Sequence, residues 1–90
     1  MKTKTYNVYA DPSHAWVKVK ISELDKLGIS KYITSFSYVR GNHAYLEEDN
    51  DAGVLIDALE DRGVKPKFKF HHTEKRSKIR SYMSFTRRGV

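Results

Sequence analysis

The sequence of 90 residues contains no cysteine, which excludes disulfide bonds and zinc sites built from thiolates. It has only two prolines and no proline- or glycine-rich stretch that would mark a linker between domains. No apolar run approaches the ~20 residues of a membrane-spanning helix, so we expect no signal peptide, no membrane partner and a cytoplasmic location. Such a short chain is typical of one domain with a single core layer between a sheet and a helix.

Charge is abundant, and it is unevenly distributed. The net charge is +6, with nine Lys or Arg residues against one acid in residues 65–90, whereas residues 47–61 hold seven acids and no base. A basic end is typical of proteins that bind phosphates or an acidic protein. The alternative is a solubilising tail beside a charged helix. Patches of opposite charge would also allow a head-to-tail homodimer.

Two segments near the start, residues 6–10 and 16–21, alternate between apolar and polar side chains and predict strands. A turn signal at residues 11–13 separates them. Ser22 is then expected to cap a short helix that ends at Gly28. The outer face of the second strand carries Trp16, Lys18 and Lys20.

The clearest local signal is a hairpin. Residues 33–40 and 43–48 flank Gly41-Asn42, a two-residue loop in which glycine can adopt the positive φ of a type II′ turn. This register places aromatic and basic side chains on one face of the hairpin and aliphatic side chains on the other. The predicted pairs are Phe36 with Glu47, Tyr38 with Tyr45, and Arg40 with His43.

The main helix is predicted over residues 52–62. Its apolar stripe should pack on the aliphatic face of the hairpin, and Gly63 follows where a C-terminal glycine is expected. Residues 64–70 predict a further strand, and Pro66, which cannot donate to a ladder, indicates an edge position for it. The residues offered as N-terminal caps are Asp49, Asn50 and Asp51.

These elements predict one α+β domain over residues 1–90. We expect a mixed or antiparallel sheet of four to six strands, with helix 52–62 packed on one face. Residues 73–85 fit either a helix or a strand, and their aromatic, serine and threonine content favours a strand. The basic C-terminal end, residues 86–90, is expected to fray.

The strand at residues 64–70 carries a row of lysines. Alternate strand residues lie about 6.6–6.8 Å apart, which approaches the spacing of successive phosphates on an extended single strand. Each lysine can therefore meet one phosphate, or the row can simply protect an edge strand from aggregation. A second basic run, mixed with serine and threonine, suits phosphate contacts or forms a flexible tail. The predicted phosphate-binding residues are Lys65, Lys67, Lys69, Lys75, Arg76, Lys78 and Arg80.

The aromatic and basic face of the hairpin is a candidate platform for stacking bases or binding a partner. In sheet-based single-strand binders, each stacked base contributes about 1–3 kcal/mol. The alternative is that a second layer, such as the C-terminal segment, covers these rings and makes them part of a core. The residues concerned are Phe36, Tyr38, Arg40, His43 and Tyr45.

Metal binding and catalysis are only weakly indicated. Adjacent histidines on a strand point to opposite faces, so His71 and His72 are poorly placed to chelate one ion. We predict no metal, no cofactor and no catalytic residue. A small metal-independent nuclease is kept as an alternative, with an acid–base pair of Asp11 and His14 or of His72 and Glu47.

Three strings of the sequence carry a resemblance: DPSHAWVKV (residues 11–19), SYVRG with AYLEED (residues 37–41 and 44–49), and HHT with SKIRSY (residues 71–73 and 77–82). With them, the chain resembles a family of small proteins encoded by bacteriophages, prophages and plasmids. The relatives more often have glycine where Ser13 and Ala15 stand. The resemblance assigns no activity to any residue, but it implies a mobile-element protein that acts inside a bacterial host cell.

The sequence therefore favours a nucleic-acid-binding accessory protein of a phage or other mobile element, with single strands as the preferred partner. The alternative is an inhibitor, of the anti-CRISPR type, that binds a host enzyme or defence complex. Inhibitors that imitate the phosphate backbone are commonly acidic, so the net charge of +6 argues against this alternative. The acidic patch that supports it comprises Glu47, Glu48, Asp49 and Asp51.

Overall fold

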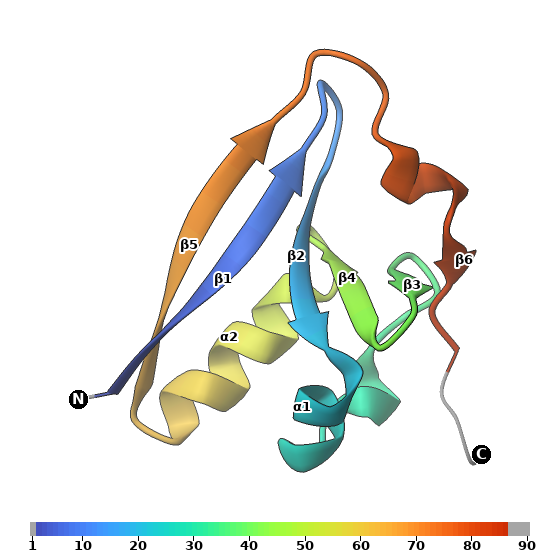
Figure 1. The fold of residues 1–90 in the computed structure, drawn as a ribbon. Coiled ribbons are helices and arrows are strands. Elements are labelled where there is room, and N and C mark those ends of the chain that lie inside the picture. Colours follow the sequence, from blue (N-terminus) through green and yellow to red (C-terminus); the bar gives the residue numbers. More distant parts are fainter. Residues whose placement is uncertain (1, 87–90) are drawn as a thin grey trace.

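The computed structural model describes residues 2–86 and contains a six-stranded sheet with its main helix on one face (Figure 1). The predicted α+β class is confirmed. The elements, with η for 3₁₀ helices, are β1 (Lys2–Ala10), β2 (Ala15–Lys20), α1 (Ile21–Lys26), η1 (Ser30–Tyr32), β3 (Tyr38–Arg40), β4 (His43–Glu47), α2 (Ala52–Asp61), β5 (Val64–His72), η2 (Lys78–Ser81) and β6 (Met83–Ser84).

The strand order is β5-β1-β2-β4-β3-β6, which makes the sheet mixed. β1 and β5 run parallel along their whole lengths, from Lys2 beside Val64 to Ala10 beside His72, and the other neighbouring pairs are antiparallel. β5 therefore lies on an edge, as its proline predicted. Among the described strands, β5 pairs with β1 alone, and its side chains alternate between the two faces of the sheet.

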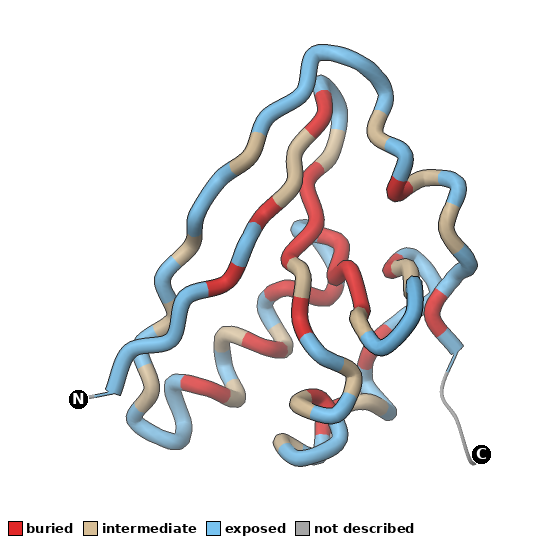
Figure 2. The backbone as a smooth tube through the Cα atoms, in the orientation of Figure 1, coloured by how far each residue is buried: buried red, intermediate tan, exposed pale blue. Residues whose placement is uncertain are grey.

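The main core lies between the sheet and α2. Figure 2 shows buried residues concentrated in β2 and β4 at the centre of the sheet, whereas β5 is largely exposed. Alternate residues of β1, β2 and β4 enter this core, because successive side chains of a strand point to opposite faces. The core includes Tyr6, Val8, Val17, Val19, Ala44, Leu46, Leu55 and Leu59.

The hairpin is confirmed at its tip and is shorter than predicted. Gly41 has φ +61°, and β3 and β4 pair Arg40 with His43 and Tyr38 with Tyr45. The predicted pair of Phe36 with Glu47 is wrong. The fully buried Ser37 hydroxyl accepts a hydrogen bond from the backbone N–H of Glu47 at 3.0 Å, which replaces the ladder at that point.

Two predicted helix caps are also wrong. α1 begins after Lys20 instead of Ser22, and no side chain caps it. Asp51 occupies the N-cap position of α2, but its buried carboxylate turns to residues 34–37, where it accepts hydrogen bonds from the backbone and hydroxyl of Thr34 and from the Ser37 hydroxyl. The predicted C-terminal glycine is confirmed, with φ +72° at Gly63.

The ambiguous segment at residues 73–85 is neither one helix nor one strand. It is irregular as far as η2 and then forms the two-residue strand β6. The predicted fraying concerns mainly residues 87–90, which lie outside the described residues. Within residues 2–86, no helix has the length and apolar character needed to cross a membrane.

Candidate nucleic-acid interface

The sheet face opposite α2 is partly covered by a second layer, the C-terminal strap, which we define as residues 73–82. Ile79 of the strap is 4% exposed and packs with Trp16 and Tyr45 of the sheet. The ring of Tyr82 lies 5.2 Å from that of Tyr45. The alternative in which the C-terminal segment covers the aromatic face is therefore confirmed for Tyr45, which is only 8% exposed.

The strap is clamped by Asp11, at the turn between β1 and β2. The Asp11 carboxylate accepts hydrogen bonds from the backbone N–H of Ser77 at 3.0 Å and from Nε and Nη2 of Arg80 at 2.7 and 3.0 Å. The side chain of Asp11 is 1% exposed. The Arg80 guanidinium, helped by the backbone donors, holds the pKa of Asp11 well below its usual range although burial raises it.

Arg80 consequently has a structural role. Besides its bond to Asp11, its guanidinium lies over the Trp16 ring, 5.4 Å from the centroid. A cation that is already engaged by a buried carboxylate and an indole ring is poorly suited to bind a phosphate. Arg80 is therefore better suited to hold the strap than to bind a phosphate, which was the role that the sequence predicted for it.

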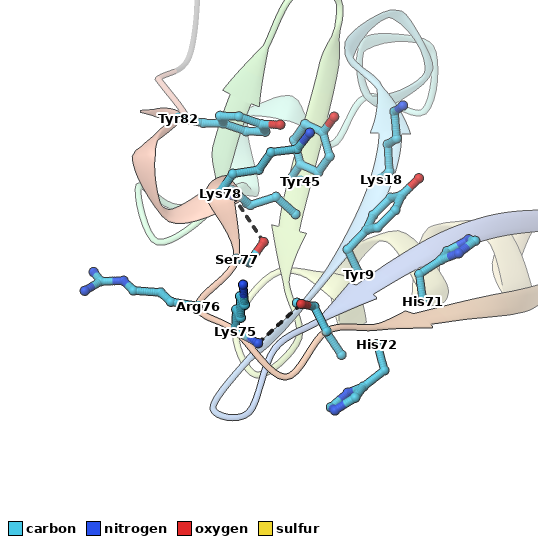
Figure 3. A pocket seen from close by; sticks show the side chains of 13 residues that line it. Tyr9, Lys18, Tyr45, His71, His72, Lys75, Arg76, Ser77, Lys78 and Tyr82 are labelled. Carbon is cyan, nitrogen blue, oxygen red and sulfur yellow. Dashed lines mark hydrogen bonds between the residues drawn. The ribbon is translucent and has the colours of Figure 1, made fainter.

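A pocket of about 540 Å³ lies between the strap and the sheet (Figure 3). Among the described residues that line it there is no aspartate or glutamate. In Figure 3, Tyr9, Lys18 and Tyr45 extend from the strands, Lys78 and Tyr82 from the strap. The pocket thus combines three tyrosines with four long cations: Tyr9, Tyr45, Tyr82, Lys18, Lys75, Arg76 and Lys78.

His71 closes the side of the pocket nearest β5. Its ring stacks on Tyr9, with centroids 4.9 Å apart and planes inclined by 17°, and its Nε2 lies 3.0 Å from Oδ1 of Asn7. Directly beyond β5, the backbone N–H of Thr73 donates to the carbonyl of Ala10 at 2.9 Å, which holds the start of the strap against β1. This side of the pocket is therefore held by contacts of His71 with Tyr9 and Asn7 and of the Thr73 backbone with β1.

The predicted lysine row leads to this pocket. Lys65, Lys67 and Lys69 are all exposed and share the sheet face of His71, because they precede it by six, four and two positions on one strand. The row and the pocket therefore form one basic surface along β5.

The pKa of His43 responds to the positive charges on the same sheet face. Burial is the main reason that the pKa of His43 lies below its ordinary value, and Lys18 and Lys20 lower it further. These lysines stand on β2, directly beside β4. The positive charge of this surface therefore extends from β5 across to Lys18 and Lys20 on β2.

The remaining residues of the predicted stacking platform are dispersed. Phe36 is 65% exposed but precedes β3 and lines no part of the pocket. Tyr38 is half-buried against Trp16, with ring centroids 6.3 Å apart, and Arg40 lies over the Tyr82 ring at 5.1 Å. The sequence analysis did not predict that Tyr9, Tyr82 and Lys18 lie with Tyr45 around one pocket. Of the three, only Lys18 had been placed, on the outer face of its strand.

The acidic features also differ from the prediction. Glu47 and Asp51 are buried, at 6% and 0% exposed, and are hydrogen-bonded internally, so the proposed acidic docking patch is reduced to Glu48 and Asp49. Neither predicted acid–base pair forms. Asp11 accepts the backbone N–H of His14 at 3.0 Å, and Glu47 lies beside the ring of His14 instead of His72.

Comparisons with known proteins assign no role to this surface. No protein-family model matches the chain, and no curated protein or solved structure shows significant similarity to it. Any role for the pocket and the lysine row therefore has to follow from the chemistry of their residues.

Proposed function

We propose that this protein binds single-stranded nucleic acid, with one base in the pocket between strap and sheet and with the adjoining phosphates along β5. The observation that carries the proposal is the union of a tyrosine-lined pocket, free of acidic side chains among the described residues, with an exposed lysine row on the same sheet face. The phosphate contacts are Lys65, Lys67, Lys69, Lys75, Arg76 and Lys78.

The pocket suits a base attached to a phosphate. Its volume of about 540 Å³ lies within the range of about 300–1,000 Å³ that is typical of small-ligand sites. The half-buried rings of Tyr9 and Tyr82 provide stacking surfaces for any base, and the cations at the rim provide charge for the phosphate. The pKa of the Tyr45 phenol is raised by burial and then by Tyr82 and Tyr9. A phenol O–H can donate a hydrogen bond to a base.

A single strand is favoured over a duplex for a steric reason. A base can enter the space between strap and sheet only when it is unstacked and unpaired, and extruding a base from a duplex costs a few kcal/mol. The resemblance to phage, prophage and plasmid proteins supports the proposal that the protein is an accessory protein of a mobile element. It would then bind nucleic acid in the cytoplasm of the host cell.

Fluorescence anisotropy tests the proposal directly, with labelled single-stranded DNA, single-stranded RNA and duplex DNA titrated at several salt concentrations. We expect submicromolar binding of one single strand at physiological salt and at least roughly tenfold weaker binding of the duplex. With six cations engaged, log K should fall against log salt with a slope of about −4. Weak binding of all three polymers that vanishes with salt would reject the proposal and direct the search to a host protein as partner.

His43 provides an independent spectroscopic test. Lys18 lines the pocket and, with Lys20, lowers the pKa of His43, so the negative charge of a nucleotide bound in the pocket should raise that pKa. NMR titration of the His43 ring with and without a single-stranded oligonucleotide measures the change. The variant Lys18→Gln/Lys20→Gln should raise the pKa of His43 in the free protein, whereas Lys26→Gln/Lys31→Gln, at exposed positions outside the strands, should leave it unchanged. An unchanged His43 pKa on saturation would mean that no phosphate lies near β2.

A further inference from the structure

A second cluster of polar side chains lies where the β1–β2 turn meets the end of β4, and it shares no residue with the pocket. His14, Glu47 and Asp49 each offer one ligand atom there, and these three atoms lie within 4.8 Å of one another. The turn that carries His14 is held in place by Asp11, which accepts its backbone N–H at 3.0 Å. Two segments of chain, the β1–β2 turn and the end of β4 with the residues that follow it, are thus brought to one point.

Glu47 is the fixed member of this cluster. Its side chain is 8% exposed, and its Oε2 accepts hydrogen bonds of 2.8 Å from the backbone N–H of Asp49 and from the backbone and side-chain amides of Asn50. These bonds orient the carboxylate so that its second oxygen, Oε1, faces His14. Hydrogen bonds of this kind commonly orient the carboxylate ligands of metal ions.

The two facing atoms lack ordinary partners. Within the described residues, Nδ1 of His14 is buried without a hydrogen bond, and no donor bonds to Oε1 of Glu47. The two atoms lie 3.5 Å apart. A charge-assisted hydrogen bond would be about 2.7–2.9 Å long. Two ligands on one tetrahedral zinc ion, each at about 2.0–2.1 Å from it, are separated by about 3.3 Å.

We propose that His14, Glu47 and Asp49 form a binding site for a zinc ion. An imidazole nitrogen and two carboxylate oxygens are ordinary zinc ligands, and three protein ligands leave a fourth position for water. Asp49 is exposed, so its carboxylate is free to rotate toward the other two ligands. Two carboxylates also balance the charge of the ion. Zinc would tie the β1–β2 turn to the turn that precedes α2.

Isothermal titration calorimetry with zinc chloride at neutral pH tests the site, using the wild-type chain and the variants His14→Ala and Asp49→Asn. We expect one ion per wild-type chain, with affinity lowered at least about tenfold in each variant. Magnesium should bind far more weakly, because it prefers a shell of oxygen ligands alone. In the wild type, zinc should also shift the ring ¹⁵N resonances of His14 in NMR spectra.

Matched controls separate this site from others. His72→Ala and Asp57→Asn make the same kinds of change at exposed positions outside the cluster and should leave zinc affinity within about twofold. Thermal denaturation without metal shows whether each variant is folded. Equal affinity in the wild type and both ligand variants, loss of affinity only in His72→Ala, or no zinc binding at all would overturn the proposal. The last outcome would leave only the 3.5 Å contact between His14 and Glu47.

Discussion

Reversing the charge of the β5 lysines is expected to remove most of the binding to nucleic acid. In Lys65→Glu/Lys67→Glu/Lys69→Glu, affinity for a single strand at physiological salt should fall by at least about 100-fold, because three phosphates would face carboxylates in place of ammonium groups. The slope of log K against log salt should change from about −4 to about −2. Anisotropy titration at several salt concentrations measures both changes.

The triple variant should fold normally. Its three positions are exposed on an edge strand, and none of the ion pairs within the described residues involves them. Circular dichroism and thermal denaturation check this point. A fold maintained with unchanged affinity would show that nucleic acid does not follow β5.

A control of equal charge separates a local site from general attraction. Lys26→Glu/Lys31→Glu takes the net charge from +6 to +2, as Lys67→Glu/Lys69→Glu does, but at exposed positions on α1 and η1. We expect its affinity to stay within about threefold of the wild type, because neither side chain belongs to the lysine row or lines the pocket. Equal losses in the two double variants would mean that binding depends on net charge alone.

Removing the clamp of the strap is expected to have the largest effect on stability. Asp11→Ala deletes a buried carboxylate that accepts five hydrogen bonds, two of them from Arg80 and three from backbone N–H groups. Breaking one partner of such a pair leaves the other uncompensated, so the free energy of unfolding should fall by about 3 kcal/mol. For a domain of this size, that lowers Tm by roughly 15 °C.

The same variant should also lose the pocket, because the strap forms one wall of it. Chemical denaturation gives the stability, and anisotropy gives the affinity for a single strand. Asp57→Ala, which removes an exposed carboxylate from α2, is the matched control and should change stability by less than about 0.5 kcal/mol. A double-mutant cycle with Arg80→Ala isolates the pair; additive effects would show that Asp11 and Arg80 are not coupled.

The contribution of Asp11 should depend on pH in a defined direction. Its pKa is lower in the folded protein than in the unfolded chain, so its stabilisation is present above pH of about 4 and is lost as the pH falls below that value. The difference in stability between the wild type and Asp11→Ala should therefore shrink as the pH is lowered from 4. A difference independent of pH would mean that the Asp11 carboxylate is not the charged partner.

Part of the candidate site could be predicted from the sequence. The lysine row of β5 follows from period-two alternation alone, and its edge position follows from Pro66. The pocket could not be predicted in this way. Arg80 meets Asp11 across 69 positions of sequence, and Tyr82 meets Tyr45 through a segment whose own pattern fits both a helix and a strand.

The buried carboxylates likewise could not be predicted from the local sequence pattern. That pattern predicted Glu47 and Asp51 as part of an exposed acidic run and Asp51 as a helix cap, which is the usual role of aspartate before an apolar stripe. In the folded chain, residues 34–37 approach the start of α2, and Asp51 bonds to them instead. A short side chain with two acceptors binds whichever donors the surrounding fold brings to it.

The sequence by itself determined the α+β class, the main helix, the turn of the hairpin and the edge strand. These depend on side-chain periodicity and on residues with restricted or unusual backbone angles, which act within a few positions of the chain. Only the tertiary structure decided which sheet face is covered by the strap, which charges are buried as partners, and where a pocket forms. Those outcomes depend on contacts between distant segments, and a local pattern carries no information about which distant segment will supply the contact.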